Sequence, residues 1–191
     1  MKKCINLSIG TTTIKKELDY DADTSYLGEY GNKLKPGCYI RSHKKFYEDI
    51  TDDDDIPNYY DRNEFNFFYP SDQGVEIGSE DYRKYAMQNY ELIEGLNNQE
   101  WYYIGIVVKT EIIAMIQNLT DKTKYTEISD TIISSLYGIE YGISNNEYTD
   151  ESYIKETIKD LLSEQKDQLL KMGFSDKEIE QSFKGAKEVD L

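Results

Sequence analysis

The residues of this sequence that could do chemistry are mostly carboxylates. The chain of 191 residues has 37 aspartates and glutamates against 22 lysines and arginines, and its net charge is −15. Twelve of the acids lie between residues 46 and 81, where Arg62 is the one base, so this segment alone carries −11. Carboxylates can bind metal ions, transfer protons or contact a cationic partner, and their spacing helps to distinguish these uses.

A calcium site is the first possibility that the spacing excludes. Asp19, Asp21 and Asp23 have the DxDxD pattern that opens an EF-hand loop. Such a loop needs glycine at its sixth position and a bidentate glutamate at its twelfth, where this sequence has Thr24 and Tyr30. We therefore predict no metal site and no cofactor, with a weak cation site at residues 52–55 as the alternative.

The sequence also lacks the common catalytic motifs, which favours a protein that is not an enzyme. His43 is the only histidine, and no hydrolase triad or zinc-protease motif accompanies it. The glycines form neither a dinucleotide-binding motif nor a P-loop. Carboxylate pairs are too abundant for spacing alone to identify a general acid and its base.

Binding of a cationic partner is the remaining use for the acidic segment. Aromatic residues interleave with its acids, which favours an ordered segment over a solvated tail. Rings beside carboxylates could imitate bases beside phosphates and meet the basic side chains of a nucleic-acid groove. The predicted partner-binding residues are Glu48, Asp49, Asp52, Asp53, Asp54, Asp55, Tyr59, Tyr60, Asp61, Glu64, Asp72 and Glu76. The alternative is an acidic loop that only keeps the protein soluble.

The charge and the apolar pattern exclude two other kinds of partner. An acidic chain repels nucleic acid, so direct binding is disfavoured. Residues 1–45 have a net charge of +4, and their bases can instead pair with the acidic segment inside the fold. The longest apolar-rich run, residues 101–116, is too short and too polar to span a bilayer, and no signal peptide is evident. Cys4 and Cys38 lack a CxxC motif, which is typical of free thiols, so we expect a cytoplasmic protein with no membrane contact.

The elements that position these residues can be predicted from local patterns. Strands are expected at residues 5–14 and 38–40, followed by an irregular connection over 46–78 in which residues 64–69 can pair as a strand. Ser79 is a good N-cap for a helix that runs to about residue 96. Residues 101–116 and 124–136 alternate and are rich in β-branched side chains, and a turn at 118–121 would join them as an antiparallel hairpin.

The C-terminal pattern predicts two helices. A helix over residues 150–172 should stop at Gly173, where a left-handed residue would let Phe174 pack back on Leu169. Ser175 and Glu178 have the capping-box spacing that begins a second helix. The expected fold is α+β: a small antiparallel sheet with a long central hairpin, one helix before it and a C-terminal helical hairpin. We divide it into an acidic domain, residues 1–149, and a helical hairpin packed on it, residues 150–191.

Several runs within residues 80–185 resemble a family of small, acidic, uncharacterised proteins from bacteriophages and related mobile elements. They are DYRKY at 81–85, NYE at 89–91, WYYIGI at 101–106, SLYGIE at 135–140 and the Leu-x-x-Gly-Phe-Ser tail at 170–175. The chain differs from that family in having Tyr137 where tryptophan is usual. The resemblance implies a mobile element inside a bacterium, where small acidic proteins recurrently inhibit host defence nucleases.

These observations lead to one functional hypothesis and one alternative. The first is a phage-encoded inhibitor of the anti-CRISPR or antirestriction kind, which binds a basic nucleic-acid groove of a host nuclease complex through its acidic, aromatic-rich segment. The alternative is a non-catalytic phage housekeeping or scaffold protein whose acids only solubilise it.

Overall fold

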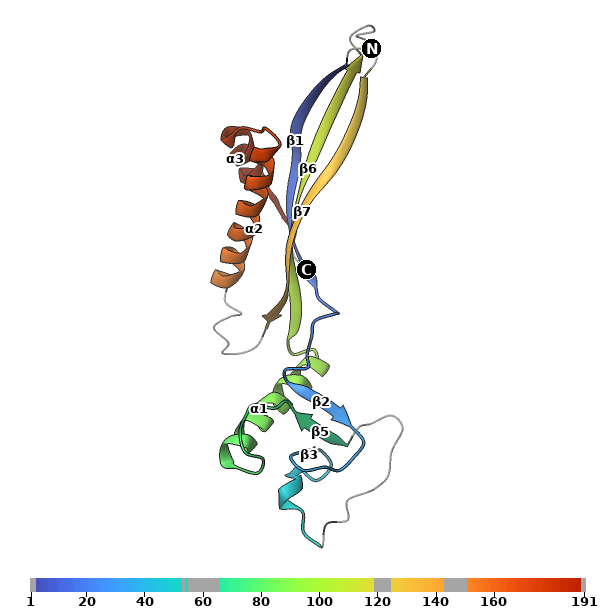
Figure 1. Cartoon of the computed structure of the whole chain (residues 1–191), viewed down its shortest axis with the longest axis vertical. Coiled ribbons are helices and arrows are strands. Elements are labelled where there is room, and N and C mark those ends of the chain that lie inside the picture. The colour runs from blue at the N-terminus through green and yellow to red at the C-terminus, as the bar shows by residue number, and fades with distance from the viewer. Residues whose placement is uncertain (1–2, 53, 55–65, 119–124, 143–150, 190–191) are drawn as a thin grey trace. The chain divides into compact units, whose positions relative to one another are not determined.

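The computed structural model describes residues 3–52, 54, 66–118, 125–142 and 151–189 (Figure 1). These residues form three α-helices, a short 3-10 helix and two four-stranded sheets. The mixed α and β class is therefore confirmed. The prediction of a single sheet is wrong. A second sheet is formed by strands that are too short to show an alternating pattern in the sequence. None of the described helices is both long and apolar enough to cross a bilayer.

The chain forms two compact units. Unit 1 combines residues 1–22 with residues 102–191, and unit 2 consists of residues 23–101. This division differs from the predicted boundary at residue 149. The C-terminal helices belong with the long strands because their apolar faces pack on those strands, whereas residues 23–101 enclose a separate aromatic core. Unit 2 carries seventeen acids and eight bases, for a net charge of −9.

Unit 1 is built on three long strands: β1 (Lys3–Leu18), β6 (Tyr102–Asn118) and β7 (Tyr125–Tyr141). β6 lies in the middle and pairs antiparallel with both neighbours, and the short β8 (Lys187–Val189) pairs parallel with β1. β7 continues beyond the predicted end at residue 136, because Gly138, with a φ of 79°, accommodates a bulge there. The predicted turn at 118–121 lies, apart from Asn118, outside the described residues.

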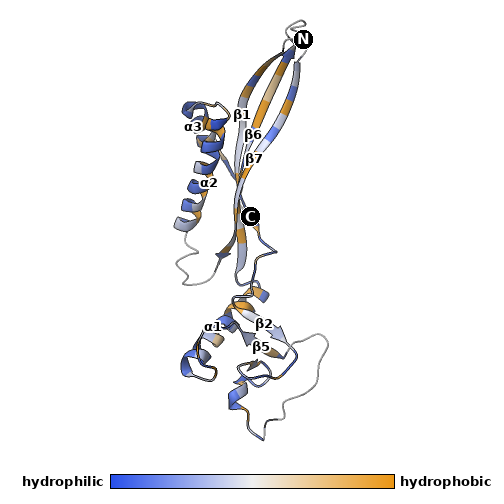
Figure 2. Ribbon diagram, in the orientation of Figure 1, coloured by the Kyte–Doolittle hydropathy of each residue, from blue (hydrophilic) through white to orange (hydrophobic). Residues whose placement is uncertain are grey.

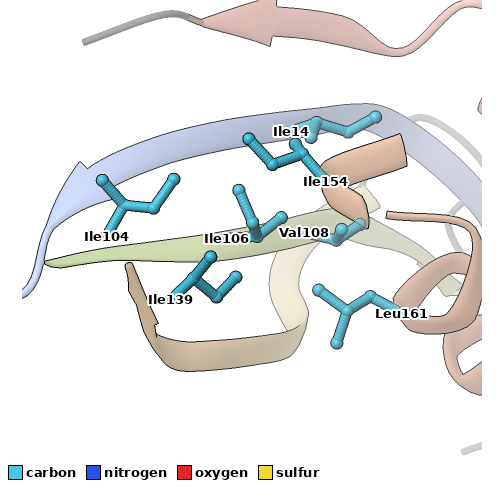
Figure 3. Packing of buried hydrophobic residues seen from close by; sticks show 7 residues of the cluster. All are labelled: Ile14, Ile104, Ile106, Val108, Ile139, Ile154 and Leu161. Carbon is cyan, nitrogen blue, oxygen red and sulfur yellow. The ribbon is translucent and has the colours of Figure 1, made fainter. Parts of the chain in front are cut away.

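Two helices, α2 (Glu151–Lys171) and α3 (Asp176–Lys184), cover one face of this sheet. Apolar residues of α2 recur at helical spacing, so they form one stripe that packs on the strands. Figure 3 shows Ile154 and Leu161 of α2 directed at isoleucine and valine side chains from all three long strands. The members of this cluster are Ile14, Ile104, Ile106, Val108, Ile139, Ile154 and Leu161.

The turn between α2 and α3 follows the predicted pattern. Gly173 has a φ of 96°, and the Phe174 N–H donates to the Leu169 carbonyl at 3.2 Å. The Gly173 N–H donates to the Leu170 carbonyl at 3.0 Å, which completes a Schellman motif. Phe174 and Leu169 share one apolar cluster, and the capping box at the start of α3 is present. The predicted helix stop and helix start are both confirmed.

A buried polar chain connects the helices to the sheet. The fully buried Gln165 of α2 accepts a hydrogen bond from Thr110 Oγ1 at 2.6 Å and donates to the Val108 carbonyl at 2.7 Å. Thr110 Oγ1 lies 3.1 Å from Thr12 Oγ1 on β1, which lies 2.7 Å from Ser182 Oγ on α3. Each hydroxyl in the chain therefore has a partner, as buried polar groups require.

Unit 2 is a small antiparallel sheet packed against one helix. Its strands are β2 (Gly28–Gly31), β5 (Phe67–Pro70), β3 (Tyr39–Ile40) and β4 (Lys45–Phe46), in that spatial order, and the 3-10 helix η1 covers Tyr47–Asp49. Helix α1 (Glu80–Asn97) begins at the predicted N-cap, where Ser79 accepts from the Tyr82 N–H. The core is aromatic: the Tyr90 ring lies 4.8 Å from Tyr39 and 5.5 Å from Phe68.

Candidate functional site

The structure describes six of the twelve residues predicted to bind a partner, and all six belong to unit 2. They are Glu48, Asp49, Asp52, Asp54, Asp72 and Glu76, from η1, the loop after it and the segment between β5 and α1. The other six lie outside the described residues: Asp53, Asp55, Tyr59, Tyr60, Asp61 and Glu64.

The Asp54 side chain points inward and forms contacts within unit 2. Its side chain is 13% exposed, and Lys45 Nζ donates to its two oxygens at 2.8 and 3.1 Å. The N–H and the hydroxyl of Thr51 also donate to it, at 2.8 and 3.0 Å. The charge of Asp54 is therefore already paired inside unit 2, and its role in partner binding stays a prediction. The expected pairing of a base from residues 1–45 with the acidic segment is confirmed at this point.

The Lys45 contact predicts a measurable change in acidity. The hydrogen bonds from Lys45 and Thr51 lower the pKa of Asp54 to about 2. Because this pKa is lower in the folded state, its stabilising contribution is present above the ordinary aspartate pKa and is lost as the pH falls toward 2. We expect Lys45→Gln to raise the pKa of Asp54 toward its ordinary value of about 3.9 in an NMR titration. Lys44→Gln, at an exposed neighbour, should leave it unchanged, and equal shifts in both variants would contradict the assignment.

The two acids of η1 connect that short helix to its surroundings. Asp49 forms an ion pair with Arg83 of α1, and this contact lowers the pKa of the Asp49 carboxyl. The Gly37 N–H donates to Glu48 Oε1 at 2.8 Å. Both side chains remain largely exposed, so each carboxylate is fixed in position and still accessible from solvent.

Acids from three segments gather around the first turn of α1. We call the following set the acid cluster: Glu48 and Asp49 of η1, Asp72 and Glu76 of the segment before α1, and Glu80 and Asp81 of its first turn. All six are exposed. Glu48 lies against Gly78, just before α1, because a β-carbon built there would be 3.2 Å from Glu48 Cγ. Burial raises the pKa of Tyr82 to about 12, and the negative charges of Glu48 and Asp72 add to this rise. Arg83 joins the group through Asp49 and through the Gly78 carbonyl at 3.3 Å.

The described aromatic rings of the acidic segment pack into or against the core of unit 2, and Tyr47 of η1 is partly buried there. Phe67 and Phe68 are 5% and 0% exposed and form part of the unit 2 core. The Tyr69 ring is contacted by Lys35 Nζ at 3.6 Å from its centroid, and its hydroxyl donates to the Lys33 carbonyl at 2.6 Å. Phe67 and Phe68 therefore present no stacking surface, whereas stacking by the other rings of the segment stays a prediction. Tyr59 and Tyr60, the rings in the predicted set, lie outside the described residues.

Glu80 and Asp81 belong to the acid cluster, although we did not predict them as binding residues. In the sequence they are explained by the helix dipole, which favours acids in a first turn. Both residues belong to the same acidic run as Glu76, and this feature of the sequence could have identified them as part of the acidic surface. Arg83 could not be connected to Asp49 from the sequence, because the two residues are 34 positions apart and no local pattern links them.

The arrangement suits electrostatic binding. Among the described residues, no group of three or more metal-ligating side chains is close enough to hold an ion. Cys38 is buried and Cys4 is half-buried, and both are free thiols. The acid cluster presents six exposed carboxylates on the described surface of unit 2.

Comparisons with protein-family models, with curated proteins and with solved structures give no match. The resemblance to phage proteins therefore stays a prediction.

Proposed function

We propose that this protein is a non-catalytic inhibitor that binds a basic nucleic-acid groove of a host defence nuclease in the bacterial cytoplasm. The observation that carries the proposal is the convergence of acids from η1, the segment before α1 and the first turn of α1 on one small region. A basic groove attracts negative charge that is held at fixed positions, as phosphates are along a nucleic acid.

The internal contacts of the cluster support this use. Arg83 fixes Asp49, and the Gly37 N–H fixes Glu48, so part of the ordering entropy has been lost before a partner arrives. Glu76 and Glu80 of the cluster are exposed, as is Asp52 in the loop after η1, and no described residue forms an ion pair with them. These three supply charge for a partner without losing an existing contact.

Charge of this kind acts mainly on the rate of association. Complementary patches steer two proteins together and raise the association rate constant by about 10- to 1000-fold at low salt. The effect weakens with ionic strength, because screening shortens the reach of the field to about 8 Å at physiological salt. A strong salt dependence of association is therefore part of the proposal.

One observation favours the alternative of a scaffold protein. Asp54 and Asp49 have internal cationic partners, Lys45 and Arg83, so two of the predicted contact acids already contribute to the stability of unit 2. In that case the exposed acids only solubilise the chain, and reversing their charge should not affect partner binding. The two functions therefore give different results in one experiment.

We expect Glu76→Lys/Glu80→Lys to slow association with a purified CRISPR effector complex or type I restriction enzyme by about tenfold at low salt and to weaken inhibition of DNA cleavage. The matched control is Glu156→Lys/Asp160→Lys on the exposed face of α2, which changes the net charge equally. Surface plasmon resonance at several salt concentrations gives the association rate constants. Equal slowing in both variants would show a net-charge effect, and no slowing in either would support the scaffold function.

A further inference from the structure

The outer edge of β7 is an unusual surface for a protein of this size. β7 is the last strand of the unit 1 sheet, and no strand lies beyond it among the described residues (Figure 1). An edge strand leaves the N–H and C=O groups of alternate residues without a neighbouring strand, and natural edges are usually short or protected by lysine, proline or a bulge. β7 is 17 residues long and has no lysine, arginine or proline. Its bulge lies near one end, at Gly138, and leaves residues 125–136 regular.

This edge strand is also apolar and exposed. Five of its large side chains are 41–65% exposed: Tyr125, Ile128, Ile133, Leu136 and Tyr137. Ile128 and Leu136 lie on the face that α2 covers farther along, and Tyr125 and Ile133 lie on the opposite face, because side chains alternate along a strand. Figure 2 shows apolar segments continuing along the three long strands where they extend beyond the helices. A strand added to β7 would flank both rows of side chains.

The charges on the regular part of β7 indicate which strand fits. Glu127 and Asp130 are its charged residues, and both are exposed. Pairing with β7 of a second copy would bring acidic strands side by side, which like charges disfavour. A segment with lysine or arginine would instead place opposite charges across the new strand pair, a favourable arrangement.

We propose that β7 is a docking edge for an extended basic segment of another protein, which adds to the unit 1 sheet as a fifth strand. The main-chain groups of β7 supply the hydrogen bonds, Ile128 and Ile133 supply apolar contacts on the two faces, and Glu127 and Asp130 select for basic side chains. This inference goes beyond the proposed function and does not rest on it, because it concerns unit 1 and needs no contact with the acid cluster of unit 2.

The test uses the full chain and a synthetic peptide of about twelve residues in which lysine alternates with valine. Amide hydrogen exchange read by mass spectrometry should show the segment 125–136 exchanging about tenfold more slowly when the peptide is bound. A peptide of equal charge with two valines replaced by proline cannot form a continuous strand and should not slow this exchange. Glu127→Lys/Asp130→Lys should abolish the protection, whereas the control Glu156→Lys/Asp160→Lys should keep it.

Three results would overturn the proposal. In the first, the lysine–valine peptide binds but leaves exchange at residues 125–136 unchanged, so that it binds by charge elsewhere on the chain. In the second, the proline peptide protects this segment equally. In the third, sedimentation shows a dimer without peptide and the segment is already protected in that dimer, so that a second copy occupies the edge.

Discussion

Replacing Phe68 with alanine is expected to unfold unit 2 while unit 1 keeps its sheet. Phe68 of β5 is fully buried, and its ring lies 5.5 Å from the rings of both Tyr30 and Tyr90. A Phe→Ala change in a core costs about 3–5 kcal/mol, through the lost transfer free energy and the cavity that remains. A unit as small as residues 23–101 has a stability near the low end of the usual 5–15 kcal/mol, so this loss removes most of it.

Hydrogen exchange resolved by segment measures this effect. In Phe68→Ala the amides of α1 should lose protection, while those of β6 and β7 keep it. Ile106→Ala is the reciprocal control, because Ile106 is fully buried in the core of unit 1 and its truncation should cost about 2–5 kcal/mol there. Equal loss of protection in both units in either variant would mean that they unfold as one.

The same variant separates the position of the acids from their number. The acid cluster exists because the fold brings η1, the segment before α1 and α1 itself together. Phe68→Ala changes no charge but should disperse these acids. The proposed inhibitor should therefore associate more slowly when unit 2 is unfolded, even though the net charge of the chain remains −15.

The parts of the fold that could be predicted are those specified by local physical chemistry. The N-cap at Ser79, the helix stop at Gly173 and the capping box at Ser175 each depend on residues within a few positions of one another. The long alternating runs of β6 and the start of β7 carry a period that only a strand satisfies.

The parts that could not be predicted depend on distant partners. β3 and β4 have two residues each, which is too short for any period, and they exist because β5 pairs with β3. The division into two units depends on the pairing of β1 with β6, which are separated in the sequence by all of residues 23–101. Nothing in the composition of β1 indicates that pairing.

The candidate site shows the same contrast. The concentration of acids is a property of the sequence, but whether each carboxylate faces a base or solvent is not. Asp52 and Asp54 are two positions apart in an acidic run, yet Asp52 is exposed and Asp54 bonds to Lys45. Phe67 and Phe68 interleave with acids in the sequence and still lie in the core. The sequence pattern of a ring between two acids is the same whether the ring points into the core or into solvent.

Replacing Gln165 with leucine is expected to destabilise unit 1 by about 2–4 kcal/mol. Leucine fills a similar volume but removes the acceptor of the Thr110 hydroxyl, which keeps its contact with Thr12. It also removes the amide that donates to the Val108 carbonyl and, at 3.3 Å, to the Ile132 carbonyl. A buried polar group that loses its partner costs about 1–3 kcal/mol, and here at least two groups are affected. The control is Gln168→Leu on the same helix. This side chain is partly exposed and donates to Glu164 Oε1 at 3.3 Å, so the change should stay within about 0.5 kcal/mol.

A second substitution tests whether the polar chain acts as a unit. Thr110→Val removes the hydroxyl that Gln165 accepts from, so the double variant Gln165→Leu/Thr110→Val replaces both partners with apolar groups. The Thr12 hydroxyl keeps its contact with Ser182 Oγ at 2.7 Å, so it retains one hydrogen-bond partner in the double variant. Urea unfolding of the two single variants and the double variant should show a loss in the double variant that is smaller than the sum of the single losses by about 1–2 kcal/mol. Additive losses would mean that the Gln165 amide stabilises unit 1 through its bonds to the strand carbonyls alone, independently of Thr110.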